Sequence, residues 1–148
     1  MIPLIFGLAG PALNDDERAL FRECDPAGYI LFARNIVDRE QMRALTDDLR
    51  SLSGRDMLPI LIDQEGGRVA RMRPPTWPPF PAGAALDRLY EIAPASAIAA
   101  ARANALALAL MLADVGVTVN CTPVLDVRRA GTHDALGDRA MGHEPMRV

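Results

Sequence analysis

The residues best suited to chemistry in this sequence form one string, DQEGGRVAR, which begins at Asp63. Asp63 ends an apolar run, and the two glycines that follow allow the backbone to turn sharply and approach a ligand. Arg68 and Arg71 are three residues apart, so both lie on one side if the segment turns helically. A carboxylate opposed by a guanidinium suits sugar hydroxyls, because each hydroxyl both donates and accepts hydrogen bonds. The same residues could equally form a buried ion pair that only pins the loop, and residue chemistry leaves both interpretations open.

A second group of polar residues lies near the C-terminal end and contains the residue types that bind metals. Its members are His133, Asp134, Asp138, His143 and Glu144. Their spacing matches neither a helical pair of ligands nor a Cys/His pattern. We therefore expect solvated loop residues here, with no metal site and no cofactor.

Four short apolar runs are expected to be strands. They cover residues 2–8, 28–32, 58–63 and 117–127. The first three have the length of buried strands and lack clean alternation, which is typical of parallel strands covered on both faces.

Helices are expected between these strands. Asn14 can cap the first, with Glu17 completing a capping box, and Asp38 can cap the second. The third should run from about Pro94, a suitable first-turn residue, to Gly116, a suitable C-terminal cap. Strands that alternate with helices predict an α/β fold with a parallel sheet.

The connection from residue 64 to residue 86 interrupts this alternation. Five prolines surround Trp77 there, so neither a helix nor a central strand is expected. The loop begins directly after a strand, where α/β proteins place their active sites. We expect Trp77 to be a packing anchor, with a sugar-stacking platform as the alternative.

The composition excludes several classes of function. The chain has 148 residues, a normal length for one domain, and its net charge of −3 offers no basic surface for nucleic acid. All 16 basic residues are arginine. The absence of lysine excludes a Walker-type phosphate loop and a Schiff-base enzyme.

The chain shows no signal of export. Its apolar start lacks basic residues, and its most apolar later stretch, 95–115, is interrupted by Arg102, Asn104 and Asp114. We expect no membrane span and a cytoplasmic protein. Cys24 and Cys121 are expected to be small buried hydrophobes rather than a disulfide.

Four motifs in order give the chain a specific resemblance. They read GYILFARN at 28–35, IDQEGGRVAR at 62–71, TPVLDV at 122–127 and GDRAMG at 137–142. Together they resemble the bacterial β-N-acetylhexosaminidases of glycoside hydrolase family 3. The resemblance implies that residues 1–148 are the N-terminal half of a (β/α)₈ TIM barrel with about four parallel strands.

The resemblance also implies an activity and a set of binding residues. The family removes terminal β-N-acetylglucosamine, typically from recycled peptidoglycan fragments, with retention of configuration. By motif position, Asp63, Arg71 and Arg139 correspond to its substrate-binding residues. The resemblance assigns Glu65 no catalytic part, so we expect it to brace its loop. Arg34 and Asn35 would either line the same rim of the barrel or cap the chain locally.

No catalytic residue can be named in this chain. The family's nucleophilic Asp and its acid/base His are expected beyond residue 148, so the chain alone should be inactive. Truncation by a broken gene, a frameshift or an incomplete assembly is one explanation. A genuine half-barrel that pairs with a second copy or another chain, and whose exposed edges favour self-association, is another. Rival functions are a family 3 β-glucosidase or xylosidase fragment and a non-catalytic sugar-binding half-barrel, and the expected partner is a small carbohydrate.

Overall fold

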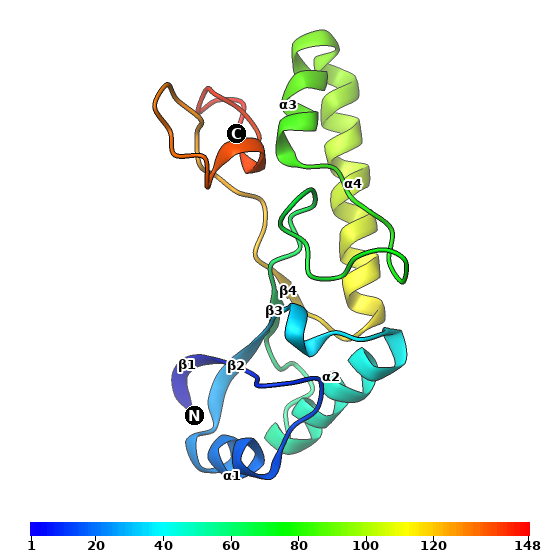
Figure 1. Cartoon of the computed structure of the whole chain (residues 1–148), viewed down its shortest axis with the longest axis vertical. Coiled ribbons are helices and arrows are strands. Elements are labelled where there is room, and N and C mark those ends of the chain that lie inside the picture. Colours follow the sequence, from blue (N-terminus) through cyan, green and yellow to red (C-terminus); the bar gives the residue numbers. More distant parts are fainter. The chain divides into compact units, whose positions relative to one another are not determined.

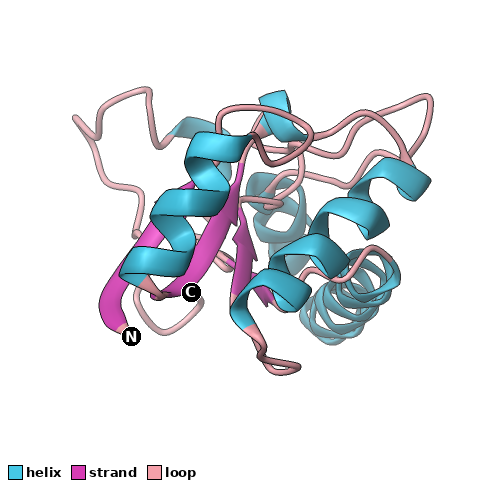
Figure 2. Ribbon diagram, turned by 90° about the horizontal axis from the view of Figure 1, so that it is seen from below, coloured by secondary structure: helices cyan, strands magenta, loops and turns pink.

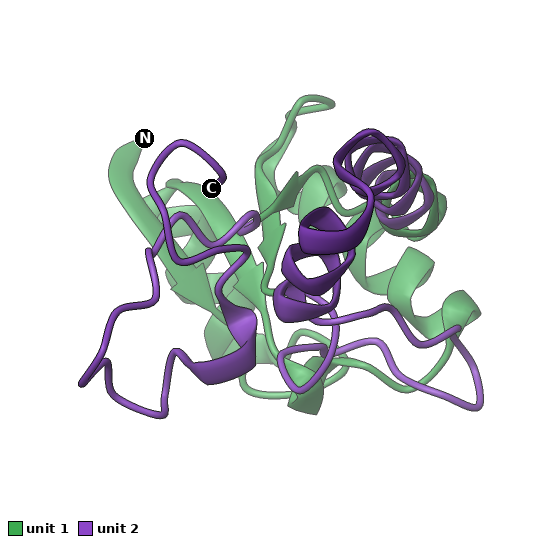
Figure 3. Cartoon of the chain, turned by 90° about the horizontal axis from the view of Figure 1, so that it is seen from above, with its two compact units in different colours: residues 1–63, 110–120 green, residues 64–109, 121–148 purple.

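The computed structural model describes residues 1–148, and the chain divides into two compact units. The first unit comprises Met1–Asp63 and Leu110–Asn120, and the second comprises Gln64–Ala109 and Cys121–Val148 (Figure 3). The first unit contains the whole sheet, whereas the second is built from helices and irregular loops.

The sheet of the first unit has four parallel strands in the order β1-β2-β3-β4 (Figure 1). The strands are β1 (Ile2–Gly7), β2 (Pro26–Leu31), β3 (Ile60–Ile62) and β4 (Val119–Asn120). The predicted α/β class and parallel sheet are confirmed. The predicted fourth strand was too long: the chain is irregular after Asn120, and Pro123 lacks the N–H that a sheet ladder requires.

The two middle strands form the core of this unit. Leu31, Ile60 and Ile62 are fully buried. In β1, by contrast, the side chains of Leu4 and Ile5 are 52% and 43% exposed. The prediction that strands are covered on both faces therefore holds for β2 and β3 and is wrong for β1, which is an edge strand.

Two helices connect these strands, α1 (Asp15–Cys24) and α2 (Arg39–Ser53) (Figure 2). The predicted capping box at the start of α1 is present: the Asn14 side chain accepts from the Glu17 N–H at 2.8 Å, and the Glu17 carboxylate accepts from the Asn14 N–H at 3.1 Å. Asp38 caps α2 as predicted by accepting from the Gln41 N–H. The predicted caps thus fix where both helices start.

One polar face of α2 forms hydrogen bonds to the end of helix α4 (Pro94–Asp114) and to the turn that follows it. The face consists of Arg39, Arg43, Thr46 and Arg50, which recur at helical spacing. The two arginines nearest the start of α2 donate to the Asp114 carboxylate, Thr46 Oγ1 donates to the Val115 carbonyl at 3.0 Å, and Arg50 Nη2 donates to the Gly116 carbonyl at 2.5 Å. These hydrogen bonds fix the position of the turn from α4 to the sheet.

Asp114 should make the first unit sensitive to acid. The hydrogen bond from Arg43 and the charges of Arg43 and Arg39 lower the pKa of the Asp114 carboxyl below its ordinary value of 3.8. A carboxyl with a lowered folded pKa contributes stability above its unfolded pKa and loses it as the pH falls through the folded value. We expect the free energy of unfolding to decline below about pH 4, and Asp114→Asn to flatten that decline.

Urea unfolding at several pH values measures this effect. Asp47→Asn is the control, because Asp47 lies on the same helix as the arginines but its side chain is 79% exposed and its ion pair with Arg50 spans 3.9 Å. Acid profiles that are parallel for the wild type and Asp114→Asn would contradict the assigned role.

The second unit contains a helix that the sequence analysis missed, α3 (Gly83–Ile92), which lies beside the N-terminal half of α4 (Figure 1). Its first residues fall within the connection predicted to be a loop to residue 86. The N-cap, Ala82, makes no side-chain hydrogen bond to the helix, so the start carried no recognisable signal. A short 3₁₀ turn, η2 (Gly137–Arg139), lies in the C-terminal segment.

Helix α4 is apolar on more than one side. It is long and apolar enough to cross a membrane by length and composition alone, and 22% of its most apolar 18-residue window is buried. A single helix of this kind is weak evidence for a span, and the expected barrel helix stays our interpretation.

The cysteines differ from the expectation of two buried side chains. Cys24 is half-buried and Cys121 is exposed, and neither is in a disulfide. Cys121 directly follows β4, where the chain leaves the sheet, so its side chain gains no cover from a continued strand.

Candidate functional site

Asp63 lies at the carboxyl edge of the sheet in the first unit. Ile62, the last residue of β3, pairs with Leu31 on one side and Asn120 on the other, and these residues end their own strands. Asp63 follows directly and is half-buried. The parallel register therefore places this carboxylate at the edge where α/β proteins bind ligands, as predicted.

The residues after β2 hold a neighbouring loop together. Arg34 Nε donates to the Leu8 carbonyl at 2.7 Å, and Asn35 Nδ2 donates to the Leu8 and Gly10 carbonyls at 3.1 and 2.8 Å. Asn35 also accepts from the Phe32 N–H at 2.8 Å and is fully buried. Asn35 caps locally through the bond from the Phe32 N–H, and the other contacts of Arg34 and Asn35 brace the loop after β1. That either side chain lines the rim stays a prediction.

In the second unit, Gln64 folds the loop that carries Arg71. Its Oε1 accepts from the backbone N–H groups of Arg71 and Met72 at 2.7 and 3.0 Å, and its Nε2 donates to the Met72 carbonyl at 2.9 Å. Gln64 is 1% exposed. The sequence analysis missed this positioning role, for which a polar residue at the end of an apolar strand was the only available signal.

Glu65 forms an ion pair with Arg139, which lies 74 positions later in the sequence. Arg139 Nε donates to Glu65 Oε2 at 2.9 Å and Nη2 donates to Oε1 at 2.7 Å, which is a bidentate pair. The Glu65 side chain is 9% exposed and that of Arg139 is 32% exposed. The expectation that Glu65 braces its loop is confirmed, and the partner it holds is one of the three predicted binding residues.

A second ion pair joins the same two segments. Here the first segment contributes the arginine and the second contributes the acid. Arg68 Nε donates to Asp138 Oδ1 at 2.8 Å, and Arg68 Nη2 donates to the carbonyls of Asp134, Ala135 and Leu136 at 2.7–3.1 Å. The motifs at 62–71 and 137–142 therefore interlock within the second unit through an acid and an arginine contributed by each. We call these two ion pairs the crossed pairs.

The proline-rich loop borders an open pocket of about 340 Å³. Its lining includes Gln64, Arg68, Arg73 and Phe80, but neither Arg71 nor Arg139. Trp77 is 3% exposed, so the prediction that it is a packing anchor is confirmed. The pocket is a feature of the loop distinct from the predicted sugar-binding arginines.

The C-terminal polar residues do not act as one cluster. His133 Nδ1 accepts from the Ala135 N–H at 3.0 Å, whereas Asp138 is occupied by Arg68. His143 Nδ1 lies 3.8 Å from Asp87 Oδ2, on helix α3. The spacing of the C-terminal residues among themselves could not show this neighbour, because it comes from a distant part of the chain.

Of the three predicted binding residues, Asp63 belongs to the first unit and Arg71 and Arg139 to the second. Each is placed by a neighbouring group: the register of β3 for Asp63, the Gln64 side chain for Arg71 and the Glu65 carboxylate for Arg139. Their convergence on one sugar stays a prediction.

Sequence comparison identifies relatives along almost the whole chain. Residues 5–148 match the family model of the glycosyl hydrolase family 3 N terminal domain. A beta-hexosaminidase from Alkalilimnicola ehrlichii is 40% identical over 99% of this chain, and one from Methylococcus capsulatus is 42% identical over 97%. The chain spans 41% of the length of each of these relatives.

Solved structures show the same fold. NagZ from Neisseria gonorrhoeae in complex with N-trifluoroacetyl-D-glucosamine superimposes with a TM-score of 0.91 at 29% identity, covering 98% of this chain and 42% of that one. A glycoside hydrolase family 3 beta-N-acetylglucosaminidase from Paenibacillus matches with a TM-score of 0.75 at 27% identity, covering 96% and 26%. The predicted architecture, four parallel strands with helices from part of a TIM barrel, is confirmed. The chain belongs to glycosyl hydrolase family 3 and corresponds to part of its N-terminal domain.

Proposed function

We propose that the protein is a β-N-acetylhexosaminidase that removes terminal β-N-acetylglucosamine residues from peptidoglycan fragments with retention of configuration. Residues 1–148 supply part of its sugar site. The observation that carries the proposal is the interlocking of two motifs by the crossed pairs, which fixes Arg139 on a rigid support. Family membership and the names of the relatives support the reaction class.

Each binding residue has a distinct chemical role in this proposal. The Asp63 carboxylate accepts hydrogen bonds from sugar hydroxyls at the edge of the sheet. Arg71 and Arg139 donate to sugar oxygens, and the planar guanidinium of Arg139 is oriented by its bidentate bond to Glu65. Such preorganisation lowers the cost of ordering side chains when the sugar binds.

Catalysis is assigned to residues outside this chain. A retaining glycosidase needs a nucleophile and an acid/base, and we assign neither to any residue between 1 and 148. The proposed nucleophilic Asp and acid/base His are placed beyond residue 148, and this chain spans 41% of the length of its relative from Alkalilimnicola ehrlichii. The 148-residue chain therefore binds sugar without turning it over.

The test compares binding and turnover in the same preparation. We expect calorimetry to show that the chain binds N-acetylglucosamine more tightly than glucose, and a chromogenic N-acetyl-β-glucosaminide to remain uncleaved. Arg139→Ala should weaken the binding, while Arg129→Ala, an exposed change in the same segment, should not. Turnover by the purified chain, or equal affinity for the two sugars, would contradict the proposal.

Two alternatives give different results in this test. A β-glucosidase or xylosidase fragment would prefer glucose or xylose. A non-catalytic sugar-binding half-barrel would bind N-acetylglucosamine but would stay inactive even when joined to the remaining part of a relative's barrel. The cytoplasmic location and self-association through the edges of β1 and β4 stay predictions of the same proposal.

A further inference from the structure

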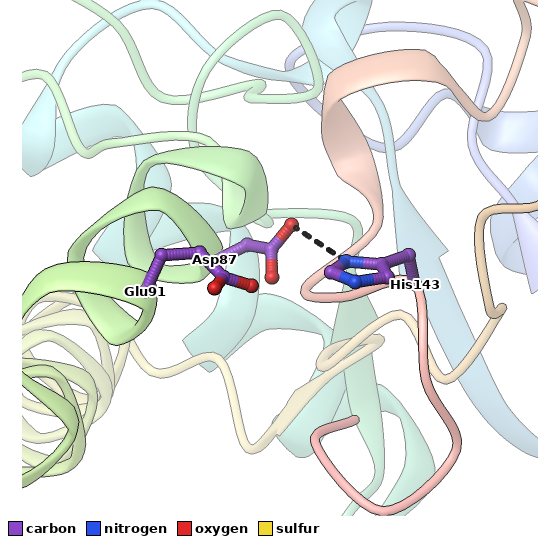
Figure 4. A group of neighbouring side chains, drawn as sticks. All are labelled: Asp87, Glu91 and His143. Carbon is purple, nitrogen blue, oxygen red and sulfur yellow. Dashed lines mark ion pairs between the residues drawn. The ribbon is translucent and has the colours of Figure 1, made fainter.

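Three side chains with metal-binding chemistry converge in the second unit, and none of them takes part in the crossed pairs. Asp87 and Glu91 are four residues apart on α3, so they lie on one face of that helix. His143 approaches from the C-terminal segment, and its ring faces the two carboxylates (Figure 4). One ligand atom from each residue can be chosen so that all lie within 4.8 Å of one another.

The burial of Asp87 shows that this group is more than a set of surface acids. Its side chain is 7% exposed, and its Oδ1 atom is buried with no hydrogen-bond partner. A buried carboxylate oxygen without a donor is costly, and native structures rarely leave one unsatisfied. This buried oxygen is therefore a candidate ligand atom for a cation.

The spacing of the three groups is close to that of a coordination shell. Ligand atoms that sit about 2.1 Å from a zinc ion are separated from one another by roughly 3–4 Å. His143 Nδ1 lies 3.8 Å from Asp87 Oδ2, too far for a direct hydrogen bond, so the imidazole is within reach of an ion bound by the Asp87 carboxylate. Only a small side-chain adjustment would bring the remaining ligand atoms into range.

The neighbouring arginines are compatible with an ion because each carboxylate has two oxygens. Arg128 Nη2 contacts Asp87 Oδ2 at 3.4 Å, and Arg147 forms an ion pair with Glu91 Oε1. Arg147 is also paired with Glu144, at 3.5 Å. These contacts leave Asp87 Oδ1 and Glu91 Oε2 as ligand atoms, and the arginines then act as the outer hydrogen-bonding partners that metal-ligating carboxylates usually have.

We propose that Asp87, Glu91 and His143 form a binding site for one divalent cation, with Zn²⁺ as the preferred ion. Two carboxylates and an imidazole are ligands of the type found in zinc sites, whereas a site for Mg²⁺ or Ca²⁺ would use oxygen ligands alone.

The site has a structural role: it ties the segment that contains Arg139 to α3. Gly83 at the start of α3 already packs against the Arg139 backbone carbonyl so closely that a Cβ there would overlap with it. An ion at His143, four residues after Arg139, would fasten the same segment at a second point.

Zinc titration of the 148-residue chain tests this proposal. We expect calorimetry to detect Zn²⁺ binding that is weakened at least tenfold in His143→Ala, since loss of an outer-shell partner alone typically costs about 10–100-fold in affinity. His143→Ala should fold, because this side chain is 46% exposed. Zn²⁺ should raise the thermal midpoint of the wild type and should raise that of His143→Ala much less.

The second histidine of the chain is the matched control. His133→Ala removes an imidazole from the same segment, and it should leave the Zn²⁺ affinity unchanged. Asp87→Asn should weaken binding by a similar factor to His143→Ala. Equal Zn²⁺ affinity in the wild type and His143→Ala, or the absence of Zn²⁺ binding by the wild type, would overturn the proposal in favour of a purely ionic cluster.

Discussion

Replacing Gly66 with alanine is expected to lower the free energy of unfolding of the protein by roughly 3–5 kcal/mol, through strain and overlap combined. Gly66 has a φ of 103°, in a region that residues with a side chain rarely adopt. A Cβ at this position would also overlap the Pro81 carbonyl oxygen and lie 3.1 Å from the Pro81 carbonyl carbon. Both obstacles are backbone atoms, so no rotation of a flexible side chain can relieve them.

Two other glycines of the second unit separate the two causes. Gly131 has a φ of 81° but no atom within 4 Å of the position that an alanine methyl group would occupy, so Gly131→Ala should cost only the strain, about 1–2 kcal/mol. Gly83 has an ordinary φ, but its Cβ would overlap the Arg139 carbonyl oxygen, so Gly83→Ala should cost about 1–3 kcal/mol. Urea unfolding of the three variants measures each cost. If Gly66→Ala had the same free energy of unfolding as Gly131→Ala, the loop backbone would have moved to relieve the overlap with the methyl group.

The same glycine matters for the site because it sits between the two ends of the crossed pairs. Glu65 precedes Gly66 and Arg68 follows it closely, and each holds a different residue of the segment 134–139. A tight antiparallel bridge between Gly66 and Val69 turns the chain between them. A change that opens this turn should therefore loosen Arg139 as well as destabilise the unit.

The parts of the fold that local chemistry determines could be predicted from the sequence. The capping box of Asn14 and Glu17, the Asp38 cap and the alternation of strands and helices all depend on residues close together in the chain. Helix α3 was missed because its start has no capping side chain. The fourth strand was overextended because the predicted run continues to Val127, whereas β4 ends at Asn120, before Pro123.

The supports of the candidate site could not be predicted in the same way. Glu65 and Arg139 are 74 positions apart, and neither residue's neighbours in the sequence indicate the other. Gln64 is a loop residue by pattern, yet it is buried and organises the backbone around Arg71. The motifs identified residues that matter, but only the tertiary structure shows that some of them act by holding others.

Asp63→Ala is expected to weaken the binding of N-acetylglucosamine by roughly 10–100-fold, because a hydrogen bond to a charged group contributes about 1.5–3 kcal/mol. Asp63 follows the buried end of β3, so its carboxylate is held at the carboxyl edge of the sheet by strands on both sides. A sugar hydroxyl that loses this acceptor has no charged replacement from the same strand. Asp63→Asn, which keeps the shape of the side chain and removes its charge, should lose a smaller part of the affinity.

Calorimetry with N-acetylglucosamine measures this loss, and circular dichroism shows whether each variant stays folded. Asp56→Asn is the control, because Asp56 is exposed in the turn before β3 and lies at the other end of that strand. If Asp63→Ala kept the wild-type affinity while Arg139→Ala lost it, sugar recognition would reside in the second unit alone. Asp63 would then serve only to shape the strand end, and the pocket would be built from the loops rather than from the sheet.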